Sequence, residues 1–203
     1  MASYPPRSLV AKNSNPKTVT RQSTILRVEE RFDDFNIQDA NSNRKFMRVK
    51  AKKATMRGRK KVYAGEDEWL FDIIQKPFRF RPTFSVRGEN KQELMKVKFR
   101  GTPLAIGRTA HATFTNAAGK PVTLTLKGTK LLGSKVEIIE EVSKAPVASI
   151  ERKRFDSLKT LARSAAGQDT YNLTVQPQVD AALIVAMCVC MDEKKEQQEA
   201  QRR

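Results

Sequence analysis

Hydrophobic and polar positions alternate along most of the chain after residue 23. Short runs of β-branched and aromatic residues alternate with polar ones, and clusters of Gly, Asn, Asp and Pro separate the runs, as is typical of strands. This number of strands is too large for one open sheet, so the pattern predicts a closed barrel or a sandwich. The predicted strands cover residues 24–29, 35–38, 46–50, 61–64, 70–74, 78–81, 83–87, 94–99, 112–115, 122–126, 136–139, 147–151 and 171–175.

Three stretches of the chain repeat one arrangement. Residues 35–49, 84–97 and 114–126 each contain an alternating strand, a turn rich in Gly, Asn or both, and a second alternating strand. Such units predict β-hairpins arranged as a meander. Alternation also predicts that one face of each strand lies on a core and the other faces water.

The pattern changes near the C-terminus, where residues 179–191 lack alternation and residues 181–191 carry no charge. Asp180 stands where a helix N-cap is expected. A helix of this length is roughly 20 Å long, whereas a membrane span needs about 20 apolar residues to cross roughly 30 Å. A helix that is apolar on every face must be buried on every face. In a chain otherwise made of strands, this predicts a helix inside a closed sheet.

The block from Asp169 to Glu193, DTYNLTVQPQVDAALIVAMCVCMDE, resembles the C-terminal signature of the LURP-one-related family. In that signature a strand ending in a Val-x-Pro step leads into an Asp-led apolar helix closed by Asp-Glu. The resemblance covers about residues 24–193 and places the chain beside the tubby C-terminal-like proteins and the phospholipid scramblases. It implies a closed antiparallel β-barrel of about twelve strands around a central C-terminal hydrophobic helix.

The resemblance also implies a role, which is phospholipid recognition by analogy with the tubby proteins that bind phosphoinositide head groups. The family as a whole has no settled biochemical activity. This chain departs from the family pattern at Gln178, where the commoner plant members have Gly, and in an extra-basic stretch near residues 44–61.

Composition excludes several classes of protein. Two cysteines, Cys188 and Cys190, are too few for a disulfide scaffold and fit a reducing compartment. They lie two positions apart on the expected helix, so they point about 200° apart and do not share a metal. His111 is the only histidine, which excludes His-dependent triads and multi-His metal sites within one chain. We therefore expect no enzyme, no cofactor and no metal, and a cytoplasmic location with peripheral association with membranes.

The net charge of the chain is +17, and most of it lies in the first half. Residues 1–100 hold 24 of the 39 basic residues but 11 of the 22 acidic ones. Residues 1–22 have no hydrophobic periodicity and predict a flexible basic arm, with a transit peptide as a weaker interpretation that three prolines oppose. Residues 23–193 form the expected barrel domain, with the central helix at 179–191, and residues 194–203 a charged tail.

A run of ten cations without one acid occupies residues 44–61 and predicts an anion-binding surface, although it also fits a solvated face that keeps a barrel soluble. If its strand alternates, Arg48, Lys50 and Lys52 share one face. We add to these candidates two arginines of the Phe-rich stretch that follows. The candidate residues are Arg44, Lys45, Arg48, Lys50, Lys52, Lys53, Arg57, Arg59, Lys60, Lys61, Arg79 and Arg81.

A second cluster interleaves cations with aromatic residues, at Lys76, residues 78–81, Phe84 and Arg87. The arrangement is compatible with base stacking on single-stranded nucleic acid. Strict alternation of Phe and Arg favours instead a strand with Phe in the core and Arg outside. Arg152, Lys153 and Arg154 form a third, supporting group.

The sequence thus predicts a binding module for anionic phospholipid head groups at a cytosolic membrane face. A basic surface of this kind fits two other partners, nucleic acid held by electrostatics and an acidic protein. The lipid species and the oligomeric state stay open.

Overall fold

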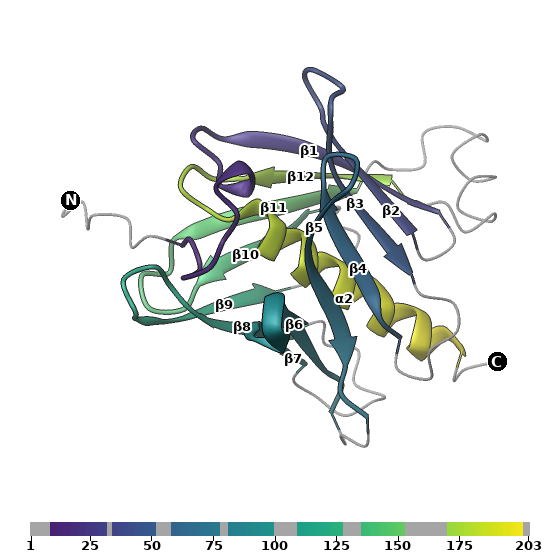
Figure 1. The fold of residues 1–203 in the computed structure, drawn as a ribbon, viewed down its shortest axis with the longest axis vertical. Coiled ribbons are helices and arrows are strands. Elements are labelled where there is room, and N and C mark those ends of the chain that lie inside the picture. Colours follow the sequence, from purple (N-terminus) through teal and green to yellow (C-terminus); the bar gives the residue numbers. More distant parts are fainter. Residues whose placement is uncertain are drawn as a thin grey trace.

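The computed structural model describes residues 9–31, 34–51, 58–77, 81–99, 109–127, 135–152 and 170–200. Within these residues, twelve antiparallel strands form a closed barrel around one long helix, α2 (Figure 1). Each strand pairs with the next along the chain, and β12 closes the barrel against β1. The elements are β1 (Thr24–Arg31), β2 (Asp34–Asp39), β3 (Lys45–Ala51), β4 (Lys60–Ala64), β5 (Glu68–Gln75), β6 (Thr83–Arg87), β7 (Glu93–Phe99), β8 (Thr109–Thr115), β9 (Pro121–Lys127), β10 (Lys135–Glu140), β11 (Pro146–Arg152), β12 (Thr170–Val175) and α2 (Ala181–Ala200), with two short 3-10 helices, η1 (Pro16–Thr18) and η2 (Glu89–Lys91).

The barrel and its central helix confirm the predicted fold class. Each of these strands overlaps a predicted one, because the alternation in the sequence is the alternation between the core and water. In β3, for example, Met47 and Val49 point into the barrel, whereas Lys50 is exposed to the solvent. One predicted strand has no counterpart: residues 78–80 lie outside the described residues, and Arg81 lies in a bend.

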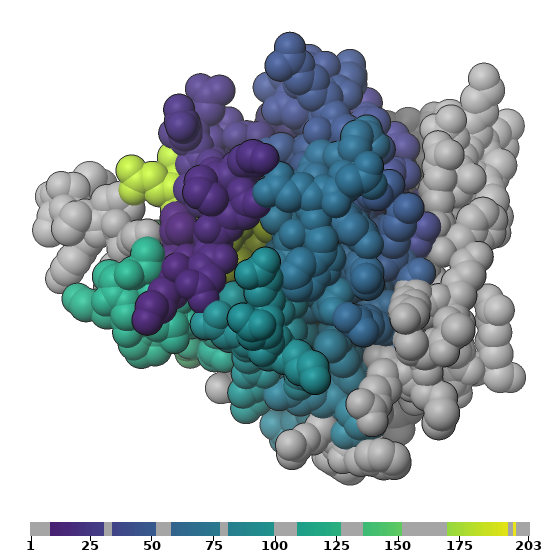
Figure 2. All heavy atoms as spheres, viewed as in Figure 1, coloured from purple at the N-terminus to yellow at the C-terminus, as the bar shows by residue number. Residues whose placement is uncertain are grey.

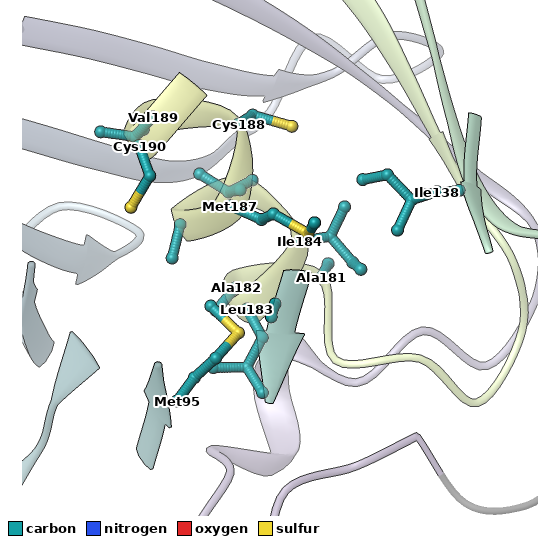
Figure 3. Packing of buried hydrophobic residues seen from close by; sticks show 14 of the residues in the cluster. Met95, Ile138, Ala181, Ala182, Leu183, Ile184, Met187, Cys188, Val189 and Cys190 are labelled. Carbon is teal, nitrogen blue, oxygen red and sulfur yellow. The ribbon is translucent and has the colours of Figure 1, made fainter. Parts of the chain in front are cut away.

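The apolar half of α2 fills the barrel, and every residue from Ala181 to Asp192 is buried. Figure 3 shows Met95 of β7 and Ile138 of β10 beside helix residues such as Ile184 and Met187. Among the described residues, no helix combines the length and the hydropathy that crossing a membrane requires. The predicted N-cap is also present, since Oδ1 of Asp180 accepts a hydrogen bond from the backbone N of Ala182 at 3.0 Å.

The helix is longer than the sequence pattern indicates. It begins at Ala181 and ends at Ala200, so residues that we expected in a charged tail continue the helix. Polar partners at the barrel mouth explain the extension. The Tyr171 hydroxyl donates to Asp192 at 3.1 Å, and the side-chain amides of Gln75 and Gln197 hydrogen-bond to each other at 2.7 Å.

The N-terminal segment also differs from the prediction. Residues 1–8 lie outside the described residues, but residues 9–20, which we call the N-terminal strap, pack on the barrel end where α2 begins. Leu9 and Val19 form isolated bridges with Val179 and Asp180. The hydroxyls of Ser14 and Thr18 donate to the carboxylate of Asp180, which is 3% exposed and needs such donors, so the strap makes specific contacts with the barrel end.

Candidate anionic-ligand surface

The outer face of β3 and β4 carries the described part of the basic run. The cross-strand register places Arg48 opposite Tyr63 and Lys50 opposite Lys61, and all four side chains point away from the core. The guanidinium carbon of Arg48 lies 4.9 Å from the centre of the Tyr63 ring, which is a cation–π distance. Alternation in the sequence therefore assigned Arg48 and Lys50 to the correct face of β3.

Acidic residues of the turn between β4 and β5 compensate part of this charge. Lys45 pairs with Glu66 at 2.6 Å, and Arg48 pairs with Asp67 at 2.6 Å. Glu68 pairs with Lys17 of the strap at 2.7 Å, and this hydrogen bond lowers the pKa of the Glu68 carboxyl. The acidic turn, residues 66–68, thus brings together cations from the strap and from β3.

Arg59 and Lys60 are engaged as well. The Arg59 guanidinium donates to Asp72, which also accepts a hydrogen bond from the Trp69 indole at 3.2 Å. Lys60 points into the barrel, is 4% exposed, and its Nζ lies 3.0 Å from Oε2 of Glu193 on α2. Lys60 is therefore not part of any solvent-exposed surface, because β4 presents Lys61 rather than Lys60 to the solvent.

Lys50 and Lys61 differ from their neighbours. Among the described residues, neither side chain makes a hydrogen bond or an ion pair, although Lys61 stands opposite Asp72 in the register of β4 and β5. Asp72 is occupied by Arg59 and Trp69. Like charges directly opposite each other on a sheet are unfavourable, so this pair of ammonium groups does not stabilise the barrel and is available to an anion.

Two other described candidates lie away from this pair. Arg44 lies in the turn before β3, at the opposite end of that strand from Lys50, and Arg81 precedes β6. Lys52, Lys53, Arg57 and Arg79 lie outside the described residues. The described part of the surface is therefore Lys50 and Lys61, with Arg48 and Arg59 beside them in ion pairs.

The second cluster is a structural one where the structure describes it. Phe84 is 1% exposed and packs edge-on against Phe99 with the ring centres 6.0 Å apart, as the core interpretation predicted. Lys76 and Lys96 both pair with Glu93, at 3.0 and 2.8 Å. Burial alone raises the pKa of the Glu93 carboxyl, but hydrogen bonds from Lys96, Ser85 and Lys76 outweigh it and lower the pKa to about 2.

His111 and the two cysteines lie in structural positions. The His111 ring hydrogen-bonds through Nδ1 to the Thr125 hydroxyl at 3.2 Å on the outer face of β8 and β9. Cys188 and Cys190 are buried in α2, and burial raises the pKa of the Cys190 thiol well above its ordinary value. A buried protonated thiol is a poor nucleophile.

A closed antiparallel barrel wrapped around a hydrophobic helix defines the class of this protein, a tubby-like barrel. The chain belongs to the LURP-one-related family, whose family model matches residues 19–192. A protein of Arabidopsis thaliana solved by X-ray crystallography is similar in structure, with a TM-score of 0.61 and 21% sequence identity over 89% of this chain and 96% of that chain. No curated protein matches the sequence.

Proposed function

We propose that this protein is a non-enzymatic binding module that recognises anionic phospholipid head groups, of the phosphoinositide type, at a cytosolic membrane face. The observation that carries the proposal is the Lys50–Lys61 pair on the outer face of β3 and β4. Opposite residues of an antiparallel pair have Cβ atoms about 5 Å apart. Two lysine side chains that start from Cβ atoms at that spacing can donate to the same phosphate group.

The surroundings of the lysine pair leave it available to an external anion rather than to an acidic side chain of the protein. Asp72 and Asp67 are already held by Arg59 and Arg48, so these two carboxylates do not compete with an anion for the lysines. Both lysines are anchored on strands of a closed barrel, which holds their Cβ atoms in place before a ligand arrives.

The proposal is tested by flotation with phosphatidylcholine vesicles that contain a phosphoinositide, or phosphatidylserine at equal surface charge. The variant Lys50→Gln/Lys61→Gln removes two charges without adding repulsion against Asp72. Each cation near an anionic surface contributes about 1 kcal/mol, so we expect binding about 30-fold weaker. The matched control Lys98→Gln/Lys120→Gln removes two exposed lysines of β7 and the β8–β9 turn, and we expect less than about a threefold change.

Two results overturn the proposal. One is an equal loss of binding in the test variant and in the control. The other is the absence of any preference between head groups combined with tighter binding to RNA or DNA at the same salt concentration, which would identify a polyanion-binding protein governed by charge density.

A further inference from the structure

A cavity of about 470 Å³ opens at the barrel end that the strap covers. The strap forms one side, β5 and the η2 turn form the other, and Ala182 and Leu183 of α2 form the floor. Figure 2 shows this hollow, with a patch of α2 in yellow between the purple strap and the blue and teal strands. The volume lies in the range of about 300–1,000 Å³ that is usual for small-molecule sites.

The charge of the cavity is opposite to that of the protein. Among the described residues, no lysine or arginine lines it, whereas the carboxyl groups of Glu89 and Asp180 do. The other polar lining comes mainly from side-chain amides, those of Asn13, Asn90 and Gln92 among them. Among the described lining residues, an anion that enters this cavity would meet amides and carboxylates but no cation.

The helix terminus at the floor does not offset this. A helix N-terminus attracts anions through its unpaired backbone N–H groups, but the Asp180 carboxylate already occupies that position and accepts from Ala182, Thr18 and Ser14. The Glu89 side chain, in contrast, makes no hydrogen bond or ion pair within the described residues. Glu89 therefore supplies the carboxylate that is available to a ligand.

The apolar lining lies on the side that also carries Glu89. Leu70 and Phe71 of β5 and Leu94 of β7 form it together with Trp69. The Trp69 indole N–H is already used by Asp72, so the contribution of this residue to the cavity is its ring. An apolar surface beside a carboxylate without a partner among the described residues suits a ligand with a hydrocarbon body and a positively charged group.

We propose that this cavity binds a small organic cation, an amine whose ammonium group pairs with Glu89 and whose apolar body contacts Trp69, Leu70 and Leu94. The site is separate from the Lys50–Lys61 pair and takes ligands of the opposite charge, so the failure of one proposal would not affect the other.

The only tryptophan of the chain, Trp69, reports binding directly through its fluorescence. The probes are three molecules of one shape, cyclohexylmethylamine, cyclohexylmethanol and cyclohexanecarboxylate, titrated into the full chain at constant salt. We expect the amine to bind at least about tenfold more tightly than the carboxylate. Non-specific attraction to a chain of net charge +17 predicts the reverse order. Equal or tighter binding of the carboxylate, or no fluorescence change with the amine, overturns the proposal.

A matched pair of variants then locates the carboxylate. Glu89→Gln should weaken amine binding about fivefold, the factor of a solvent-exposed ion pair, and leave binding of the alcohol unchanged. Glu151→Gln on β11 removes an exposed carboxylate outside the cavity lining and should leave both unchanged. Equal effects of the two variants on amine binding overturn the assignment of Glu89.

Discussion

The Nζ of Lys60 on β4 lies 3.0 Å from Oε2 of Glu193 on α2, so one ion pair joins the barrel wall to the central helix. The same Nζ lies 5.4 Å from the centre of the Phe35 ring on β2. The exposed fractions of the Lys60 and Glu193 side chains are 5% and 17%, so water screens this pair far less than the ion pairs of the outer face.

We predict that Lys60→Ala lowers the free energy of unfolding by about 3 kcal/mol, because it removes the ammonium group that faces a largely buried carboxylate. Lys61→Ala, one residue along the same strand, should change it by less than about 0.5 kcal/mol. Urea unfolding of both variants measures the difference. The double variant Lys60→Met/Glu193→Leu should recover most of the loss, and a similar cost for Lys60→Ala and Lys61→Ala would contradict the prediction.

The buried helix gives a second prediction. Ile184 is fully buried beneath the barrel wall, so Ile184→Ala should cost about 2–5 kcal/mol through the cavity it leaves. Val142→Ala is the control, since Val142 is 65% exposed and its loss should change stability by less than about 0.5 kcal/mol. A chain that ends at Gln178 lacks the core element and should show no cooperative urea transition.

Much of the fold was predictable from the sequence because one physical rule, burial of alternate side chains, governs the strands. The unbroken apolar run of residues 181–191 identified the central helix by a different rule, because a helix that is apolar on every face must be buried on every face. The strap was not predictable, because its anchoring hydroxyls, those of Ser14 and Thr18, resemble the solvated side chains of a loop. Both hydroxyls donate to Asp180, which lies more than 160 residues away along the chain.

The candidate surface was predictable in part. Alternation assigned Arg48 and Lys50 to the outer face of β3. In β4 it did not show that Lys60 rather than Lys61 points inward, because residues 59–61 at the start of the strand are all cations. The acidic turn at residues 66–68 lies within reach of Lys45 and Arg48 only because β4 and β3 are paired. Trp69 and Glu89 likewise meet at one cavity through the barrel topology, since no local pattern links them.

Gln178 supplies a third prediction. Its backbone φ is +61°, in the left-handed region, and its N–H donates to the carbonyl of Thr20 at 2.7 Å. This conformation explains why glycine, the residue of the commoner plant members, suits the position. Gln178→Gly should stabilise the protein by about 0.5–1 kcal/mol, because strain relief in the native state exceeds the gain in unfolded-state entropy.

The measurement is again urea unfolding, and Gln38→Gly, inside β2, serves as the control. Gly destabilises strand interiors by removing packing and adding unfolded-state entropy, so the two Gln→Gly substitutions should change stability with opposite signs. A destabilising Gln178→Gly would show that the side chain contributes more than the backbone conformation costs.

The last prediction concerns pH and the Glu93 cluster. Hydrogen bonds from Lys96, Ser85 and Lys76 lower the pKa of Glu93 to about 2 from an ordinary value of 4.5, although burial opposes the change. Because the folded pKa is below the unfolded one, the ionised carboxylate contributes stability above pH 4.5, and this contribution is lost as the pH falls from 4.5 towards 2. The carboxylate is one-third exposed, so solvent screening limits the contribution to on the order of 1 kcal/mol.

Comparison of the wild type with Glu93→Gln isolates this contribution from the general effect of acid. At neutral pH the variant should be less stable than the wild type, and the difference should shrink steadily between pH 4.5 and about 2, because protonation makes the wild-type side chain neutral as well. Glu151→Gln, an exposed carboxylate without such partners, should show a small difference at every pH. A Glu93→Gln difference that stays constant across this range would mean that the lysines and Ser85 do not hold the carboxylate in its ionised form, and that its contribution to the barrel comes from packing alone.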